Sequence, residues 1–592
     1  MRTGLTTFND DRFLRLLWEI PLENLGQAKK WNLFSKGGDY AKYYTDIHLV
    51  INRSNNGQEL AEVNKNLNGQ VAQSRQGSTY YFKPGLTFTS RSGLGISVRA
   101  LPAGSVISHN APTIYPINNI SNQFLLGWVN SRLIKTLIEI QSSADYYTPG
   151  SVKMVPWIAP SENDYFSIEK QMPSLVNNYC FRSQIDETSP VFDCLYLGEG
   201  IRNTYNDLLV EIEEKKEKIR QSQSEISNIV DDIYGIDSKA VCLDLLENDP
   251  DNDVPIDQVL LTDYSTCILS YLIGCVFGRW NISLAAKKEK KRPVIEPFKS
   301  LPICPPGMLQ NVQGLPVTPD DAPADYPLRI RWGGILVDDE GHPEDFEACL
   351  REALRVIWGE RTDAIEAEAC QILGVRSLRE YFRKPTWFFV DHLKRYSKSR
   401  RQAPIYWPLS TPSCSYTLWL YYHCLNDQTL YSCVNDFVDP KLKQMSDEAT
   451  RLRMKKGRSA TDEKELERLT DFERELRDFR EEMLRVAKFW KPNLNDGVEI
   501  TAAPLWKLFQ HKPWQKRLKE TWQKLEAGED DWAHLAYSIW PERVREKCKA
   551  DKSLAIAHDL EELYVEPPAS TKKKKAKKTV VDEETEGWFN DD

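Results

Sequence analysis

Residues 203–236 read NTYNDLLVEIEEKKEKIRQSQSEISNIVDDIYGI, and this stretch divides the chain into two parts of different composition. Its apolar residues recur at helical spacing from Leu208 to Val230, while almost every other position is charged or polar. Such a stripe predicts one long, exposed helix that serves as a spacer and is compatible with one arm of a coiled coil. Gly235 is the predicted stop of this helix.

The part before the spacer has short runs that are typical of β-strands. Examples are residues 47–51, 80–82 and 96–99, and turn-forming pairs such as Asn56-Gly57 and Pro84-Gly85 separate them. This alternation predicts an antiparallel or mixed sheet. Residues 122–141 are predicted to form one helix between these strands, because the leucines of this segment recur on one helical face.

The part after the spacer is predicted to be mainly helical. A proline-rich connector at 287–327 has the composition of a surface linker, and helical periodicity returns at 343–395, 440–486 and 500–548. The last 25 or so residues, including lysines in 572–578, have the low complexity of a disordered tail. The expected fold class is α+β, with an N-terminal α/β lobe, a long helical spacer and a mainly α-helical C-terminal region.

Bulk composition limits the class of protein. A chain of 592 residues is too long for one ordinary core, so roughly three to five domains are expected. With 77 basic and 86 acidic residues the net charge is −9, which argues against a uniformly basic nucleic-acid coat but allows local basic patches. The scattered cysteines form no C-x-x-C pair, so a zinc site is not expected. We expect a cytoplasmic protein without a signal peptide or a membrane partner.

Two groups of residues are candidates for contacting nucleic acid. In the N-terminal lobe, glycines that permit close backbone approach lie among basic, aromatic and polar side chains near probable turns. These candidates are Lys36, Gly37, Gly38, Tyr40, Lys42, Tyr43, Arg53, Lys83, Arg91, Ser92 and Arg99. An ordinary surface β domain explains the same loops equally well.

The second group lies between residues 383 and 401, where seven cations stand against one acid, Asp391, with aromatic residues interleaved. The cations are Arg383, Lys384, Lys394, Arg395, Lys398, Arg400 and Arg401. In an acidic protein this local excess favours a phosphate-tracking clamp. The alternative is a solvated helix end.

Catalytic signatures are missing from the sequence. Methyltransferases that act on the amino groups of DNA bases use a D/N/S-P-P-Y/F/W turn, but the Pro-Pro pairs here read CPPG at 304–307 and EPPA at 566–569. A G-x-G at 198–200 precedes the long helix; a lobe-closing turn explains it better than a site for S-adenosylmethionine. No catalytic residue and no metal ligand is therefore assigned.

Several segments in combination resemble one family. They are GLTTFNDDRFLR at 4–15, KGG at 36–38, YFKPGLT at 81–87, SVR at 97–99, LLGWVNS at 125–131, YLIGCVFGR at 271–279 and LNDGV at 494–498. This pattern resembles the target-recognition region, and the region that follows it, in type IIG restriction–methylation enzymes and in the PglX adenine methyltransferases of BREX phage-defence systems. The resemblance covers most of residues 1–565.

The resemblance implies a division of labour. In the family an upstream catalytic domain binds S-adenosylmethionine and methylates adenine N6, and the region similar to this chain reads double-stranded DNA. We therefore expect no cofactor in this chain, S-adenosylmethionine on a catalytic partner, and as partners DNA with that methyltransferase subunit or other defence proteins. A split enzyme, a specificity subunit and a truncated gene all remain open.

On this basis the expected divisions are as follows: 1–200 target-recognition lobe, 201–235 helical spacer, 236–330 second part of the recognition region with the proline-rich linker, 331–440 helical domain with the basic aromatic stretch, 441–486 charged helical hairpin, 487–566 tryptophan-rich helical domain and 567–592 disordered tail. Two rival hypotheses are a structural scaffold of a defence complex and an intact adenine methyltransferase with an unrecognised catalytic site.

Overall fold

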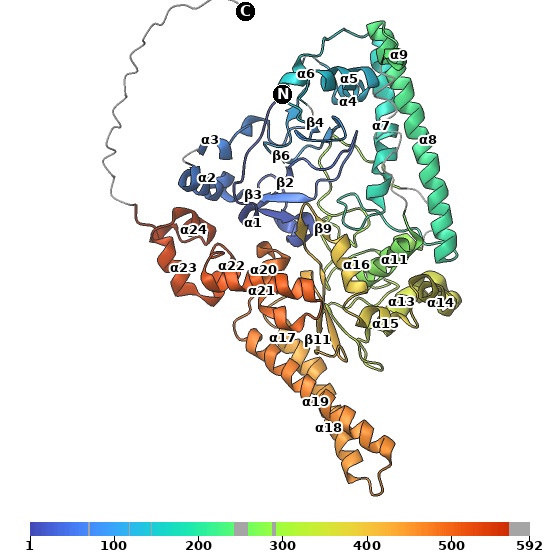
Figure 1. Cartoon of the computed structure of the whole chain (residues 1–592), viewed down its shortest axis with the longest axis vertical. Helices are drawn as coiled ribbons and strands as arrows, with labels where there is room; N and C mark the ends of the chain where they lie inside the picture. Colours follow the sequence, from blue (N-terminus) through green and yellow to red (C-terminus); the bar gives the residue numbers. More distant parts are fainter. Residues whose placement is uncertain (69–70, 118, 144, 242–258, 287–291, 567–592) are drawn as a thin grey trace, which may run out of the picture.

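The computed structural model describes residues 1–592 except 69–70, 118, 144, 242–258, 287–291 and 567–592 (Figure 1). The expected disordered tail, with its lysines and its second Pro-Pro pair, lies outside the described residues. Within them, one continuous cluster of buried hydrophobic side chains extends from Leu5 to Ala536. The sheets and helices below therefore share a common core.

Two small sheets form the N-terminal lobe, as the alternating strand pattern predicts. Their strands are β1 (Leu14–Leu16), β2 (Trp31–Ser35), β3 (Leu49–Asn52), β4 (Gly85–Phe88), β5 (Val98–Leu101), β6 (Ser105–Ile107) and β7 (Thr113–Ile114). The first sheet has the order β1-β3-β2-β6 and the second β5-β4-β7. In these sheets β2 and β6 pair in parallel and the other neighbours are antiparallel, so the expected mixed sheet is confirmed.

The predicted strand at 80–82 is wrong, because these residues form a turn. A short 3₁₀ helix, η3 (Ser78–Tyr80), follows Gly77, and Phe82 has a positive φ of 67°. Backbone hydrogen bonds hold Phe82 in place: its N–H donates to the Ser105 carbonyl, and Gly104 N–H donates to the Phe82 carbonyl. The aromatic run has the composition of a strand, but the Tyr80 and Tyr81 rings instead lie against the cations Lys83 and Arg53.

The predicted helix at 122–141 is two helices, α4 (Asn122–Asn130) and α5 (Arg132–Ile140). The break falls at Ser131, whose backbone is extended and whose hydroxyl donates to the Trp128 carbonyl. Asn130 accepts from Val98 N–H through its Oδ1 and donates to the Val98 carbonyl through its Nδ2. Polar side chains that bond backbone groups in this way compete with helix continuation.

The long spacer helix is confirmed as α8 (Ile201–Tyr234), which ends at Gly235 in the left-handed conformation. Its predicted stripe is buried, from Leu208 to Val230. The helix lies beside α7 (Glu162–Gln184) (Figure 1). It is therefore one of a packed pair and not a free-standing rod.

The proline-rich connector is expected to be a surface linker, and this is wrong for its part around residues 304–309, whereas most of residues 310–327 lie at the surface. Ile295, Cys304 and Met308 are buried within the main core. Gly307 lies so close to the Asp193 carbonyl that a Cβ would lie 1.6 Å from that oxygen. Prolines here fix a loop that packs against the core, and proline content alone does not separate the two cases.

The C-terminal region is mainly helical, as expected, but it also contains a three-stranded antiparallel sheet. Its strands β8 (Ile335–Val337), β11 (Tyr406–Ser410) and β12 (Thr417–Tyr421) have the order β11-β12-β8. Around them lie α11 (Leu261–Val276), α13 (Phe346–Trp358), α14 (Thr362–Leu373), α15 (Leu378–Arg383) and α16 (Phe388–Arg395). A two-residue hairpin, β9 (Ser397–Lys398) and β10 (Arg401–Gln402), follows α16.

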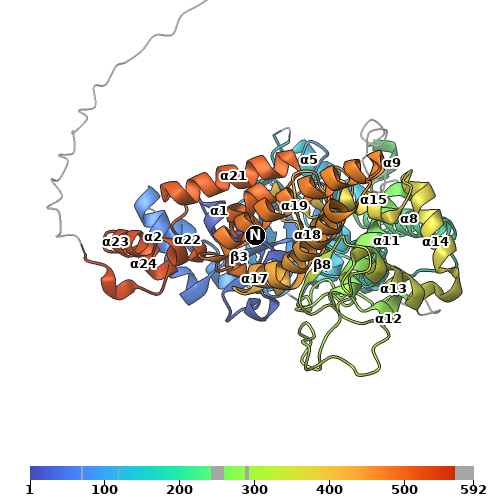
Figure 2. The ribbon, with the colours of Figure 1, turned by 90° about the horizontal axis from the view of Figure 1, so that it is seen from below.

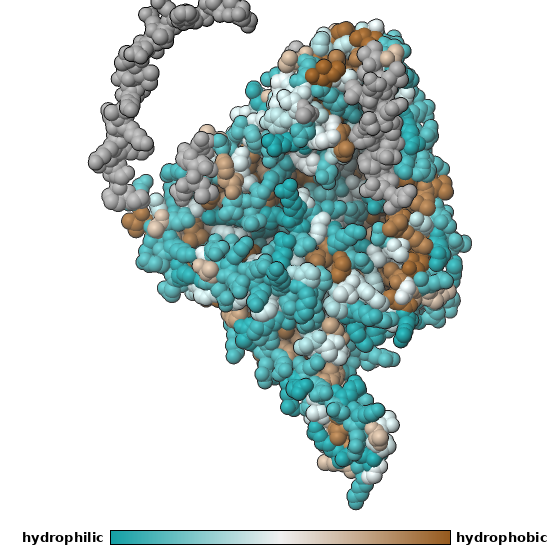
Figure 3. Space-filling model, viewed as in Figure 1, coloured by the Kyte–Doolittle hydropathy of each residue, from teal (hydrophilic) through white to brown (hydrophobic). Residues whose placement is uncertain are grey.

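The charged stretch at 440–486 is a helical hairpin, as the sequence predicts. It consists of α18 (Asp439–Met454) and α19 (Ala460–Ala487), which we call the helical arm. The arm projects away from the sheets (Figure 1), and a view along it from below places it in front of the body (Figure 2). Its surface is mostly hydrophilic (Figure 3).

The two ends of the described chain meet. The last helices are α20 (Val498–Ala502), α21 (Lys512–Ala527), α22 (His534–Ile539), α23 (Pro541–Cys548) and α24 (Lys552–Ala557), and they lie against the N-terminal lobe (Figure 1). Trp31 Nε1 donates to Asn495 Oδ1 at 2.8 Å, and Val498 N–H donates to the buried Glu19. The N-terminal lobe is thus completed by residues almost 500 positions later.

Candidate nucleic-acid interface

Three cations of the N-terminal lobe lie over aromatic rings. The Arg2 Cζ is 5.0 Å and the Lys83 Nζ 5.4 Å from the centroid of the Tyr80 ring, and the Arg53 Cζ is 4.9 Å from that of Tyr81. Among the described residues none of the three has a carboxylate partner. We call these three cations with Tyr80, Tyr81 and Phe82 the Tyr80 patch. Cations held on rings, and not neutralised by acids, remain available to an outside anion.

The backbone around the Tyr80 patch is strained. Asn55, Asn56 and Gly57 are consecutive residues with positive φ values of 50°, 57° and 77°, and Phe82 has φ 67°. Asparagine tolerates this conformation, but an aromatic residue rarely adopts it. Such outliers persist only where the surrounding structure imposes them, and they concentrate at functional sites. The loop that carries Arg53 and the turn that carries Lys83 are both of this kind.

The glycine loop at Lys36, Gly37 and Gly38 follows strand β2. Gly37 and Gly38 have positive φ, as expected of glycines that allow a close approach. Lys36, however, is already paired with Asp10, and Thr89 Oγ1 donates to the Gly38 carbonyl at 3.0 Å. The loop is therefore held from inside the lobe, and Lys36 is not a free cation.

Three N-terminal candidates were expected at the surface and are instead buried: Lys42, Tyr43 and Arg99. Arg99 Nη2 donates to Thr89 Oγ1 at 2.9 Å, and burial lowers its pKa to about 10, so the guanidinium stays charged at neutral pH. The Tyr43 ring packs on Tyr179. These residues support the glycine loop from below, and the expectation that they face DNA is corrected.

The remaining N-terminal candidates lie apart from the Tyr80 patch in their contacts. Arg91 is exposed, with its Cζ 5.6 Å from the Tyr146 ring centroid, and Ser92 follows it in the same loop. Tyr40 is half-buried, and its hydroxyl accepts a hydrogen bond from Lys135 Nζ. Arg91 remains a candidate for an outside anion, whereas Tyr40 belongs to the wall behind the glycine loop.

The basic stretch at 383–401 differs from its expected form as an outward-facing clamp. Five of its seven cations have partners within the protein: Arg383 with Asp338, Lys384 with Glu380, Arg395 with Glu187, Lys398 with Asp186 and Arg401 with Asp11. Lys394 and Arg400 are exposed and lack a partner among the described residues. Composition overstated the free positive charge, because acids distant in sequence neutralise most of it.

Arg395 shows this most clearly, since its side chain is only 11% exposed. Its Nη2 donates to Thr266 Oγ1 at 2.9 Å, and its Nη1 lies 3.4 Å from Glu187 Oε1. Nearby, the buried His392 accepts backbone hydrogen bonds from Ile405 and Tyr406 through Nε2. Burial keeps the pKa of His392 well below its usual range, so the ring is neutral and suited to accept. Residues 383–401 are therefore held mainly by contacts within the protein, and we call this segment the junction.

Arg400 lies at the tip of the β9–β10 hairpin. Ser399 and Arg400 have φ values of 51° and 64°, which are the signs of a type I′ turn built without its usual asparagine or glycine. The hairpin is held at its base, where Lys398 pairs with Asp186 and Arg517 Nη1 donates to the Gln402 side chain. The structure thus presents, on a strained and anchored turn, an arginine that no carboxylate of the described residues pairs with.

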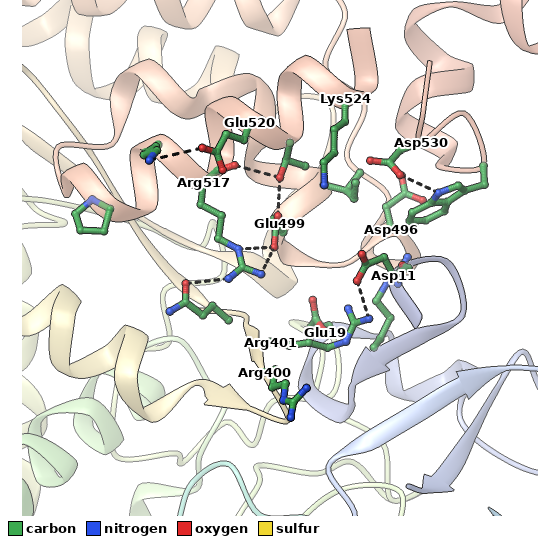
Figure 4. A pocket seen from close by; sticks show the side chains of 17 residues that line it. Asp11, Glu19, Arg400, Arg401, Asp496, Glu499, Arg517, Glu520, Lys524 and Asp530 are labelled. Carbon is green, nitrogen blue, oxygen red and sulfur yellow. Dashed lines mark hydrogen bonds and ion pairs between the residues drawn. The ribbon is translucent and has the colours of Figure 1, made fainter. Parts of the chain in front are cut away.

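The hairpin tip borders a cavity of about 510 Å³ between the first residues of the lobe and α21 (Figure 4). Six acids and six cations line it: Asp11, Glu19, Asp496, Glu499, Glu520 and Asp530 with Arg15, Arg400, Arg401, Lys516, Arg517 and Lys524. Several are paired with one another, as Arg517 is with Glu499. The balanced charge makes this cavity a poor site for a polyanion on its own.

Asp186 anchors the hairpin, and its ionisation gives a pH-dependent prediction. Burial alone would raise its pKa, but Lys398 and the hydrogen bonds from Thr188 outweigh burial and hold it at about 2. A carboxyl whose pKa is depressed by folding stabilises the protein above its unfolded pKa of about 4, and this contribution is lost as the pH falls.

Replacing Asp186 with asparagine is therefore expected to destabilise the protein near pH 7. The difference from the parent should shrink between about pH 4 and pH 2, where the parent carboxyl is itself protonated. Urea unfolding at several pH values measures this. A stability difference independent of pH would show that the charge of Asp186 contributes nothing.

The backbone groups of the G-x-G turn at 198–200, and of the start of α8 after it, form hydrogen bonds with side chains of the protein itself. Glu368 accepts hydrogen bonds from the N–H groups of Ile201 and Arg202 at the start of α8, and Trp358 Nε1 donates to the Gly198 carbonyl at 2.7 Å. The donors that a cofactor would need are thus taken by α14, and these residues do not fit S-adenosylmethionine. In the described part of the chain no cluster of metal-binding side chains occurs, and no helix is long and apolar enough to span a bilayer.

The sequence of this chain is similar to those of known proteins. No family model matches it. It is 22% identical over 517 residues to the adenine-specific methyltransferase PglX of Lacticaseibacillus casei (strain Zhang), covering 80% of this chain and 40% of that protein. It is 24% identical over 549 residues to the adenine-specific methyltransferase BrxX of Escherichia coli O9:H4 (strain HS), covering 83% and 41%.

The similarity is to adenine-specific methyltransferases. It confirms the PglX-type resemblance of the sequence as a distant relationship, while the resemblance to type IIG enzymes stays a prediction. The chain spans about 40% of the length of the curated relatives it matches. The activity of those whole proteins is therefore carried to this chain only as a proposal.

Proposed function

We propose that this chain is the DNA-recognition part of a bacterial adenine-specific DNA methyltransferase of a restriction–modification or phage-defence system. The observation that carries the proposal is the Tyr80 patch, whose three cations lie on aromatic rings and form no ion pair with a carboxylate in the part of the chain that the structure describes. Double-stranded DNA is the partner that such a surface suits, because guanidinium and ammonium groups bind phosphates and base edges. The relationship to adenine-specific methyltransferases names the chemistry that recognition would serve.

In this proposal, methyl transfer takes place on a separate catalytic part that binds S-adenosylmethionine. The sequence lacks the D/N/S-P-P-Y/F/W turn that must receive a flipped adenine. The G-x-G turn is closed by Glu368 and Trp358. This chain contributes position and sequence preference, and its own residues carry no step of the reaction.

The test is binding of the full chain to a labelled duplex over a range of salt concentrations. We expect affinity to fall steeply with salt, because each neutralised phosphate releases condensed counterions. Incubation with DNA and labelled S-adenosylmethionine should yield no N6-methyladenine from this chain alone. Absence of DNA binding even at low salt would refute the recognition role, and clear methylation would refute the division of labour.

Arg400 at the hairpin tip allows a prediction in which stability and binding change in opposite directions. Arg400→Gly should raise the free energy of unfolding by up to about 1 kcal/mol, because glycine adopts positive φ without strain. The same change should weaken DNA binding and reduce the magnitude of the log–log salt slope by about 0.9, the value of one phosphate contact.

Ser399→Gly is the matched control, because it relieves the same turn and keeps the guanidinium. It should stabilise the protein without altering the salt slope. Thermal melting and anisotropy titrations measure both quantities. If the two variants bind DNA equally well, Arg400 makes no contact with DNA.

A further inference from the structure

The helical arm projects from the body of the protein without support near its end. Glu475 accepts a hydrogen bond from Ser413 in the β11–β12 turn, and at the base Lys441 pairs with Asp339. Between these anchors and the tip, the hydrogen bonds and ion pairs of the described residues all stay within the arm. Residues 460–474 of α19 extend about 22 Å at 1.5 Å per residue. The tip therefore reaches well beyond the body (Figure 1).

The arm tip, residues 451–458, reads RLRMKKGR and has five cations and no acid. Its turn is well defined. Gly457 has a positive φ of 70°, and Ser459 caps α19 reciprocally with Asp462. Lys455 bonds both carboxylate oxygens of Asp462 at 2.8 Å, and with the Ser459 hydrogen bonds it holds the Asp462 pKa at about 2. One cation thus fixes the turn.

The other cations of the arm tip differ in their ion pairs from the arginines of helix α19 (Ala460–Ala487), which we call the stem. Along α19 the arginines are paired with acids: Arg468 with Glu465, Arg474 with Asp471, Arg477 with Glu473 and Arg485 with Glu482. At the tip, Arg451, Arg453 and Lys456 are exposed and have no carboxylate partner among the described residues. The stem pairs these four arginines with its own acids, whereas three cations of the tip face outward without such a partner in the described part of the chain.

We propose that the arm tip is a second DNA contact, which binds the phosphate backbone without reading sequence. This inference rests on the proposed function and assigns it a surface that lies apart from the Tyr80 patch. Exposed arginine and lysine heads at the end of a rigid, hydrophilic arm suit phosphate oxygens, and they offer no pocket for a base edge. An extension of about 22 Å equals the rise of roughly six base pairs at 3.4 Å each. The tip would therefore contact DNA beside the recognised site.

The experiment compares two triple variants of the full chain that lose the same charge. The tip variant is Arg451→Gln, Arg453→Gln, Lys456→Gln, and the stem control is Arg468→Gln, Arg474→Gln, Arg485→Gln. On a long duplex the tip variant should show a log–log salt slope reduced in magnitude by up to about 2.7, or about 0.9 for each lost contact. The stem control should show the parent slope, because its arginines are already neutralised.

Sequence preference, measured as the ratio of affinities for two duplexes, should be the same in the parent and the tip variant. Shortening the duplex from both ends should remove the difference between them. Circular dichroism melting is expected to show the same midpoint for the tip variant as for the parent, since the replaced side chains are exposed.

The outcomes separate the two proposals. A parent that binds DNA, with equal salt slopes for parent and tip variant, overturns the arm contact and leaves the recognition role standing. Equal loss in the tip variant and the stem control also overturns it, because net charge then explains the effect. A parent that binds no duplex at any salt concentration refutes the recognition role and the arm contact together.

Discussion

Replacing Glu187 with alanine is expected to lower the free energy of unfolding by about 3–5 kcal/mol, because it strands the buried guanidinium of Arg395 without its counter-charge. In the parent, Glu187 is 5% exposed and also accepts hydrogen bonds from Ser270 Oγ and Trp280 Nε1. Urea unfolding at pH 7 measures the loss. The change is large because two hydrogen-bond donors lose their acceptor and Arg395 loses its counter-charge at once.

The double variant Glu187→Leu, Arg395→Met is the comparison for Glu187→Ala. Removing both charges and filling the space with apolar side chains should recover much of the lost stability, since the desolvation of the pair disappears with it. If Glu187→Ala costs less than 1 kcal/mol, water or another group already satisfies Arg395. The junction beneath the hairpin would then owe little to this ion pair.

Arg53→Ala is expected to produce the largest change in DNA binding among single substitutions. If its guanidinium makes a bidentate contact with a guanine, the loss is about 1–3 kcal/mol, and preference at one base position is relaxed. Lys83→Ala should instead weaken all sequences about equally, as the loss of a phosphate contact does. Affinities for a set of duplexes with single base changes distinguish the two results.

Arg53→Lys serves as the control for charge. Lysine keeps the positive charge over the Tyr81 ring but lacks the planar fork, so the salt slope should remain and the base preference should fall. Unchanged affinity and preference in both Arg53 variants would exclude this residue from the interface. The Tyr80 patch would then lose the observation that supports it best.

Elements with local periodicity could be predicted from the sequence. The stripe of α8 and its stop at Gly235, and the two helices of the arm, follow from spacings within each segment. The sheet β11-β12-β8 could not, because β8 pairs with β12 across some 80 residues that include helices α13 to α16. Strand pairing over such separations depends on the whole fold and leaves little trace in any one window.

The candidate site also contains residues that local sequence marks and residues that only the fold brings together. Arg53 and Lys83 stand beside turns that the sequence already marks, so their loops were found. Arg2 was missed, since only the folded chain brings it over the Tyr80 ring. The basic stretch at 383–401 misled for a related reason. Arg401 bonds the Asp10 backbone 391 positions away, and composition cannot register so distant a partner.

The contact between the two ends of the chain has a consequence for how the protein is made. Trp31 bonds Asn495, Glu19 receives the N–H of Val498, and Arg12 Nη2 donates to the Ser553 carbonyl. During synthesis β1 and β2 emerge well before these partners, and their polar groups are satisfied only when the partners have been made. Pairings this distant in sequence form slowly and leave apolar surface exposed meanwhile. The N-terminal lobe is synthesised before α20 to α24, yet it matures only after those helices have been translated.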